Sequence, residues 1–165
     1  MDIFEKWLEK NMQHIALTDR SYRSTHLNEC KDVLPKKELN TELATYGDAV
    51  LKLALCKILY GTTEDGLSEA KKKYETDEVL VKVIARHYKI LDILRFDKDD
   101  GNMPQDYDYK KESSKKEAKH KYIATAVEAC LGAIWEESHD FKKICDIVEK
   151  WKSLIDQAGS KDPTP

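Results

Sequence analysis

Residues 43–55 read LATYGDAVLKLAL, a stretch that is apolar on most faces of a helix. A segment of this kind is typical of a helix that lies in the centre of a domain. We expect Asn40 or Thr41 to cap this helix, which then runs to about Tyr60. Asp48 is the one acid in the stretch, and its position in an otherwise apolar helix calls for a physical explanation.

A second apolar stretch, YIATAVEACLGAIW at residues 122–135, also contains a single acid, Glu128. Burying an unpaired carboxylate costs several kcal/mol, so each acid needs a partner or a hydrated cleft. Each acid alone could simply face solvent or accept a local hydrogen bond. Two converging carboxylates would instead match the charge of one magnesium ion, which takes few protein carboxylates and keeps several waters. Small residues that permit close helix contact flank both acids: Gly47, Ala49, Ala126 and Ala129.

The rest of the chain also reads as helix, with no persistent strand pattern. Thr76 is a candidate N-cap with acids in the following turn, and Gly61 and Gly66 bracket a turn. We therefore predict an all-α domain over residues 1–157, followed by a disordered tail at 158–165. The expected helices besides the two central ones, the second of which covers 119–137, are 2–16, 67–74, 76–88, about 90–96 and 140–157, with a long surface loop at 97–118.

Composition restricts the class of protein. Hydrophobic residues make up 41% of the 165-residue chain and charged residues 36%, which is typical of a globular protein with a heavily charged surface. We expect no membrane span and no secretory signal. The four cysteines form no C-x-x-C pair, so neither a disulfide framework nor a zinc site is indicated. We expect a reduced, cytoplasmic protein.

Positive charge is concentrated in one segment although the net charge is −3. Residues 110–121 read KKESSKKEAKHK, with six lysines against two glutamates, just before the helix that carries Glu128. From composition alone, this segment could be a solvated, flexible loop or a basic surface that meets a polyanion.

Four segments in this order resemble the ribonuclease III endonuclease domain: ALTDRSY at 16–22, LATYGDAVLKLAL at 43–55, residues 67–96, and ATAVEACLGAIW at 124–135. The resemblance spans roughly residues 3–152. It implies an all-α fold, usually a two-fold homodimer, that cuts double-stranded RNA with magnesium, for which manganese can substitute. Asp48 and Glu128 match the family's aspartate and glutamate, and the resemblance assigns both to catalysis and to the metal. Given the resemblance, the basic segment 110–121 could meet an RNA backbone, because double-stranded RNA is read mainly through phosphate and 2′-hydroxyl contacts. The candidate RNA-binding residues are Lys110, Lys111, Lys115, Lys116, Lys119 and Lys121.

The chain also departs from the family's usual pattern. Thr41, Ala44 and Thr125 stand where the usual motifs place further acids. Spacings of seven, four and three residues put these positions on one helical face with the surviving acid. The compact Mini-III branch is similar at the same places and is an active nuclease. We expect no double-stranded-RNA-binding domain after Trp151.

These observations leave three functions open. The first is a magnesium-dependent endoribonuclease that processes structured or double-stranded RNA through a metal-activated water. The alternative is a catalytically inactive RNA-binding or ribosome-associated scaffold with the same fold, and a third reading is a helical domain of unrelated function. We expect a homodimer, since a double-strand cut needs two centres. Thr45 stands where the family has an interface aromatic, with Tyr46 beside it.

Overall fold

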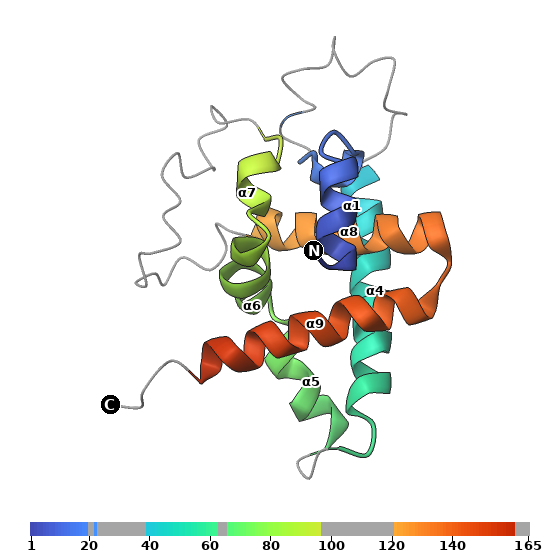
Figure 1. Cartoon of the computed structure of the whole chain (residues 1–165), viewed down its shortest axis with the longest axis vertical. Coiled ribbons are helices and arrows are strands. Elements are labelled where there is room, and N and C mark those ends of the chain that lie inside the picture. The colour runs from blue at the N-terminus through green and yellow to red at the C-terminus, as the bar shows by residue number, and fades with distance from the viewer. Residues whose placement is uncertain (20–21, 23–38, 63–65, 97–120, 161–165) are drawn as a thin grey trace.

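Helices provide almost all the regular structure of the chain. The computed structural model describes residues 1–19, 22, 39–62, 66–96 and 121–160 (Figure 1). Within these ranges no strand forms, and the only bridge between extended residues joins Thr18 to Arg95. The prediction of an all-α fold is therefore confirmed. The elements are α1 (Ile3–Lys10), η1 (Ile15–Leu17), α4 (Leu39–Leu59), α5 (Leu67–Glu75), α6 (Asp77–Val79), η2 (Leu80–Ala85), α7 (Ile90–Ile93), α8 (Lys121–Ser138) and α9 (Phe141–Gly159).

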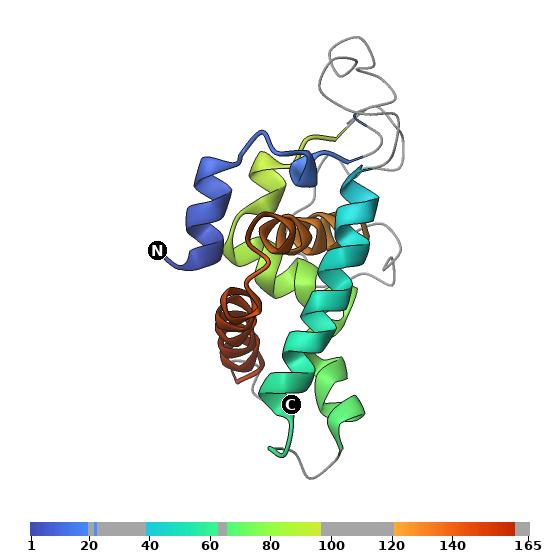
Figure 2. The same cartoon turned by 90° about the vertical axis from the view of Figure 1, so that its right-hand side faces the viewer.

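The two apolar helices form the centre of the fold, as their sequences predicted. Figure 1 shows α4 running vertically, with α8 and α9 lying across it, and Figure 2 shows α8 and α9 nearly end-on beside α4. The most extensive helix contact is between α4 and α8. Ten of the eighteen residues of α8 are buried. None of the helices in the described ranges is long and apolar enough to span a membrane.

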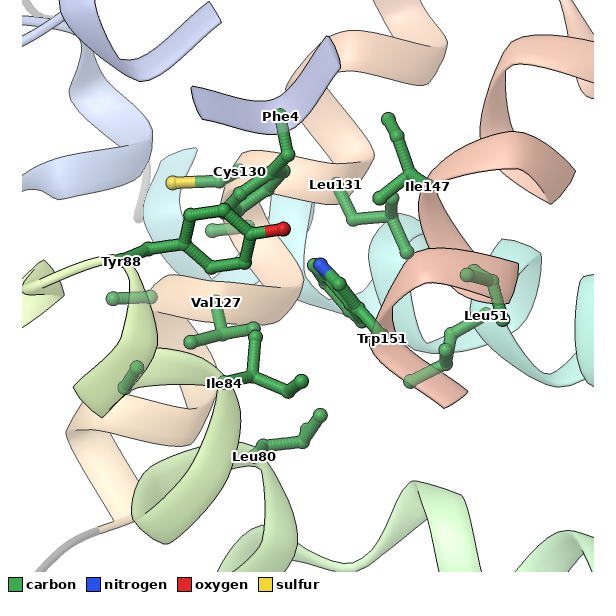
Figure 3. Packing of buried hydrophobic residues seen from close by; sticks show 14 of the residues in the cluster. Phe4, Leu51, Leu80, Ile84, Tyr88, Val127, Cys130, Leu131, Ile147 and Trp151 are labelled. Carbon is green, nitrogen blue, oxygen red and sulfur yellow. The ribbon is translucent and has the colours of Figure 1, made fainter. Parts of the chain in front are cut away.

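Aromatic residues from three elements fill the core beside α8 (Figure 3). The ring of Phe4 lies 4.8 Å from that of Tyr88 and 5.1 Å from that of Trp151, both edge to face. Such pairs contribute about 0.5–1.5 kcal/mol beyond the area that they bury. Leu131 of α8 and Ile147 of α9 are buried in the same cluster. The N-terminal helix is thus tied to the C-terminal one through the core.

The first helix is shorter than predicted. We expected one helix over residues 2–16, but α1 ends at Lys10. The side chain of Asn11 donates a hydrogen bond to the carbonyl of Trp7, and its backbone N–H donates to Leu8. Local side-chain bonds of this kind compete with helix continuation, which apolar spacing alone does not reveal. The chain then makes the 3₁₀ turn η1.

The predicted cap of α4 is wrong. The helix already includes Leu39, so Asn40 and Thr41 lie inside its first turn. The buried Asn40 side chain instead donates a hydrogen bond to the carbonyl of Ala16 at 2.6 Å. Asn40 therefore fixes the start of α4 against η1.

The segment after α5 contains a change of helix type. Thr76 is the N-cap as predicted, since its hydroxyl accepts a hydrogen bond from the N–H of Val79. The following residues form not one α-helix over 76–88 but the short α6 and then the π-helical η2. Lys89 takes a left-handed conformation with φ of 52°, which separates this unit from α7. π-helical segments are rare and often lie near functional sites.

The predicted limits agree closely with the structure for α8 and α9, but not for α7. The helix expected at 90–96 ends at Ile93, because Arg95 instead exchanges backbone hydrogen bonds with Leu17 and Asp19. The helix expected at 119–137 is α8, and the one expected at 140–157 is α9, which begins after an Asp140 cap. The predicted loop 97–118 and the last five residues of the predicted tail lie outside the described residues.

Candidate metal centre at the crossing of α4 and α8

Two glycines allow α4 and α8 to touch backbone to backbone. A Cβ on Gly47 would overlap the main-chain carbonyl oxygen of Glu128, and a Cβ on Gly132 would overlap that of Leu43. Any other residue at these two positions would force the helices apart. Because Asp48 follows Gly47 directly, this contact fixes Asp48 in the helix segment that touches Glu128.

The prediction that the small residues beside the two acids permit close helix contact holds for only some of them. Ala126 and Ala129 are buried in the core, in agreement with close helix contact. Ala49 is exposed and makes no part of the crossing. The contact therefore depends on glycine at 47 and at 132, and the second of these had not been singled out.

Asp48 is not the isolated acid that its sequence context suggested. Its Oδ2 accepts a hydrogen bond from Nζ of Lys52 at 2.7 Å, one helical turn further along α4. The Asp48 and Lys52 side chains are 37% and 46% exposed, so this ion pair lies at the solvent edge of the crossing. The hydrogen bond to Asp48 raises the pKa of Lys52 above its ordinary value.

Glu128 is half-buried and lies in an excess of negative charge. Burial, and after it the charges of Asp48 and Asp77, raise the pKa of Glu128 from 4.5 to about 7. Lys52 and Lys121 act in the opposite direction but do not compensate. The two acids of the central helices are therefore close enough to repel each other, and burial together with this repulsion makes ionisation of Glu128 less favourable than that of an exposed glutamate.

Sequence reasoning missed two groups that act on this pair. The i,i+4 spacing of Asp48 and Lys52 is the ordinary spacing of a helical ion pair and could have been used. Asp77 begins α6 and influences Glu128 only because α6 packs against α8. No local pattern indicates that contact.

The substituted family positions do not add carboxylates. Thr41 is exposed, Ala44 is buried and Thr125 is half-buried. Among the described residues no three His, Cys, Asp or Glu side chains form a group that could hold a metal ion. Two carboxylates with water in the remaining positions nevertheless match how magnesium is commonly bound. The excess negative charge on Glu128 also fits a divalent cation, so the residues present are compatible with Mg²⁺.

One of the six candidate RNA-binding lysines lies in the described part of the chain. Lys121 begins α8 and is near enough to Glu128 for its charge to lower the pKa of that carboxyl group. The others, Lys110, Lys111, Lys115, Lys116 and Lys119, lie outside the described residues.

The family sequence model for the ribonuclease III domain matches residues 41–139, which is more than half of the chain. The chain belongs to the ribonuclease III domain family. The matched region begins in α4 and ends just after α8, so it includes both Asp48 and Glu128. No curated protein and no solved structure matches the sequence.

Proposed function

We propose that this ribonuclease III-family protein is a magnesium-dependent endoribonuclease that cleaves double-stranded or structured RNA during RNA processing. The observation that carries the proposal is the pair of carboxylates at the glycine contact. Asp48 and Glu128 come from two helices that touch at this contact, and burial together with the charge of Asp48 raises the pKa of Glu128 by more than Lys52 and Lys121 offset. A divalent cation would relieve that imbalance.

Asp48 and Glu128 would hold the ion, and a different interaction opposes metal binding at each carboxylate. The Asp48 carboxylate is accessible but hydrogen-bonded to Lys52, whereas Glu128 must lose the proton that its raised pKa favours. When bound, Mg²⁺, or Mn²⁺ in its place, supplies an activated water and a Lewis acid for phosphodiester hydrolysis. In this proposal Lys121 would attract an RNA phosphate through its positive charge.

The test is cleavage of an RNA duplex over a magnesium titration. Asp48→Asn and Glu128→Gln should each reduce cleavage by at least about 100-fold, since each removes a negative charge from a two-carboxylate site. Asp146→Asn is the matched control, because it removes an exposed carboxylate that pairs with Lys142 on α9. Normal cutting by either site variant would refute the assignment of the site.

The competing function is a catalytically inactive RNA-binding or ribosome-associated scaffold. It is supported by the threonine, alanine and threonine at positions 41, 44 and 125, which leave the site with few acids. The same experiment separates the two functions, provided that RNA binding is measured in parallel. Binding of the duplex without cleavage at any magnesium concentration would establish the scaffold.

We also propose that the protein forms a homodimer through the exposed side of α4. Tyr46 and Leu53 of α4 are 55% and 57% exposed, and their spacing of seven places them on one face of the helix, while Tyr60, which is 80% exposed, directly follows the end of α4. An exposed apolar stripe of this kind is typical of an interface. In an antiparallel dimer, α4 of the second copy runs in the opposite direction. If Tyr46 of one copy lies against Leu53 of the other, then Glu42 lies against Lys57, because both pairs are centred on the same point of α4. The self-pairing is thus complementary in charge.

The dimer is tested by sedimentation velocity. Wild-type protein should sediment at twice the chain mass of 19.1 kDa. Leu53→Lys should give the monomer, because it places charge in the centre of the apolar stripe. Met12→Lys, at a residue that is 55% exposed away from α4, is the control. A monomeric wild type, or a Leu53→Lys dimer of unchanged affinity, contradicts this interface.

A further inference from the structure

We propose that Lys52 is a resident counter-ion of the Asp48–Glu128 pair, which a divalent metal must displace and which therefore sets the metal affinity of the site. The inference rests on the metal site of the proposed function and goes beyond it. It assigns a role to a side chain that is neither a carboxylate nor a candidate RNA contact.

The geometry places the Lys52 ammonium where a metal would have to compete with it. Its Nζ lies 2.7 Å from Oδ2 of Asp48 and its charge also acts on Glu128. A metal that took this Asp48 oxygen would replace the hydrogen bond and would be repelled by the neighbouring ammonium. The Lys52 side chain is 46% exposed on a flexible four-carbon stem, so it can move into solvent without disturbing the core.

The local charges support the same conclusion. The carboxylates that act on Lys52 or Glu128 number four, and three ammonium groups oppose them, since Lys71 pairs with Glu75; one net negative charge is left when all are ionised. The carboxylates are those of Asp48, Glu75, Asp77 and Glu128, and the ammonium groups those of Lys52, Lys71 and Lys121. Without Lys52 the cluster would carry two negative charges, the charge that one divalent ion neutralises. Lys52 thus weakens the attraction of the site for a metal and stabilises the acids when no metal is bound.

Direct metal binding tests the inference without relying on catalysis. Free Mn²⁺ is measured by electron paramagnetic resonance in titrations of the wild type, Lys52→Gln and Lys52→Arg. Lys52→Gln should lower the Mn²⁺ dissociation constant about tenfold, because the competing charge and its hydrogen bond are both lost. Lys52→Arg keeps the charge and should stay within about twofold of the wild type.

The matched control is Lys142→Gln, which removes the same net charge from an exposed i,i+4 pair with Asp146 on α9. It should leave Mn²⁺ affinity unchanged, whereas Asp48→Asn should weaken binding in the wild-type background. An unchanged dissociation constant in Lys52→Gln overturns the inference. So does an equal tightening in Lys142→Gln, which would reflect net charge, or the absence of Mn²⁺ binding in every variant.

Failure of this inference is distinguishable from failure of the proposed function. Suppose that the wild type cuts RNA and Asp48→Asn abolishes cleavage, but Lys52→Gln leaves the Mn²⁺ dissociation constant unchanged. That result contradicts only the counter-ion role of Lys52. Tighter Mn²⁺ binding by Lys52→Gln in a protein that never cuts RNA contradicts only the nuclease. Thermal melting of each variant without metal checks that the fold is intact.

Discussion

Two carboxylates in different parts of this molecule have opposite environments. Asp156 of α9 accepts hydrogen bonds from Lys73 and Tyr74 of α5 and from Lys152 of its own helix. Burial alone would raise its pKa, but the bonds from Lys152, Lys73 and Tyr74 outweigh that effect and hold the pKa at about 2. The Asp156 carboxylate therefore has three hydrogen-bond donors, and the bonds from Lys73 and Tyr74 link α5 to α9.

The Glu128 carboxylate at the α4–α8 crossing is in the reverse situation. Burial and the charges of Asp48 and Asp77 raise its pKa to about 7. A carboxylate paired with lysines has a lowered pKa, whereas burial and neighbouring carboxylates raise it. The comparison therefore separates a group that links two helices from one whose negative charge is only partly compensated.

The largest effect should come from the glycine contact on which the crossing depends. Gly47→Ala places a methyl group against the Glu128 carbonyl and should lower the free energy of unfolding by about 3 kcal/mol or more. Urea unfolding followed by circular dichroism measures the loss. A Gly47→Ala variant that is as stable as the wild type would show that the close approach of α4 and α8 does not define the site.

The control for this substitution lies in α9. A Cβ on Gly159 meets nothing within 4 Å, so Gly159→Ala in the last turn of α9 should be neutral or stabilise by up to about 1 kcal/mol. A similar loss for both alanine variants would show that helix propensity, rather than the crossing, was being measured.

A smaller effect should follow from removing the charge of Glu128. Since its folded pKa of about 7 lies above the ordinary 4.5, Glu128 contributes stability below pH 4.5 that is lost as the pH rises through 7. Relative to the metal-free wild type, Glu128→Gln should therefore gain about 1–3 kcal/mol between pH 4.5 and pH 8. Urea unfolding in EDTA at both pH values measures this.

Glu149→Gln, which removes an exposed carboxylate from α9, is the control, and its stability relative to the wild type is measured under the same conditions. A Glu128→Gln variant that behaved in the same way would remove the contrast with Asp156. The repulsion described at the crossing would then not operate in solution.

The smallest effect should come from Asp156, the carboxylate with three donors at the contact between α5 and α9. Asp156→Asn should lower the free energy of unfolding by about 1 kcal/mol at pH 7, a modest value because the side chain is partly exposed. Its lowered pKa means that this stability is present above pH 4 and is lost as the pH falls through about 2. The difference from the wild type should disappear over that range.

Asp146→Asn is a suitable reference, since Asp146 has a single exposed lysine partner and should contribute less than about 0.5 kcal/mol. Equal losses for the two variants would mean that the three donors of Asp156 act no better than one.

The fold was largely accessible from sequence because α4, α8 and α9 carry strong apolar patterns. The local failures have physical reasons. Asn11 ends α1 through side-chain bonds, and the π-helical turns of η2 differ from α-helix in hydrogen-bond register rather than in apolar spacing. Neither feature changes which residues are buried, so neither is visible in a hydrophobic pattern.

The candidate site was accessible in a more limited way. Two isolated acids and the family resemblance predicted that Asp48 and Glu128 converge, and the structure places them within electrostatic reach. Their role as metal ligands stays a prediction. The pairing of Asp48 with Lys52 follows from helical spacing and was overlooked, whereas the influence of Asp77 depends on how α6 packs against α8.

The backbone contact at Gly47 and Gly132 has a consequence for how such a site can change over time. Because main-chain atoms set the helix separation, the alignment of position 48 with position 128 does not depend on the sizes of surrounding side chains. A lineage could lose or regain carboxylates at positions 41, 44 and 125 while this alignment persists. The set of carboxylates at the crossing can then change while the contact between α4 and α8 is kept.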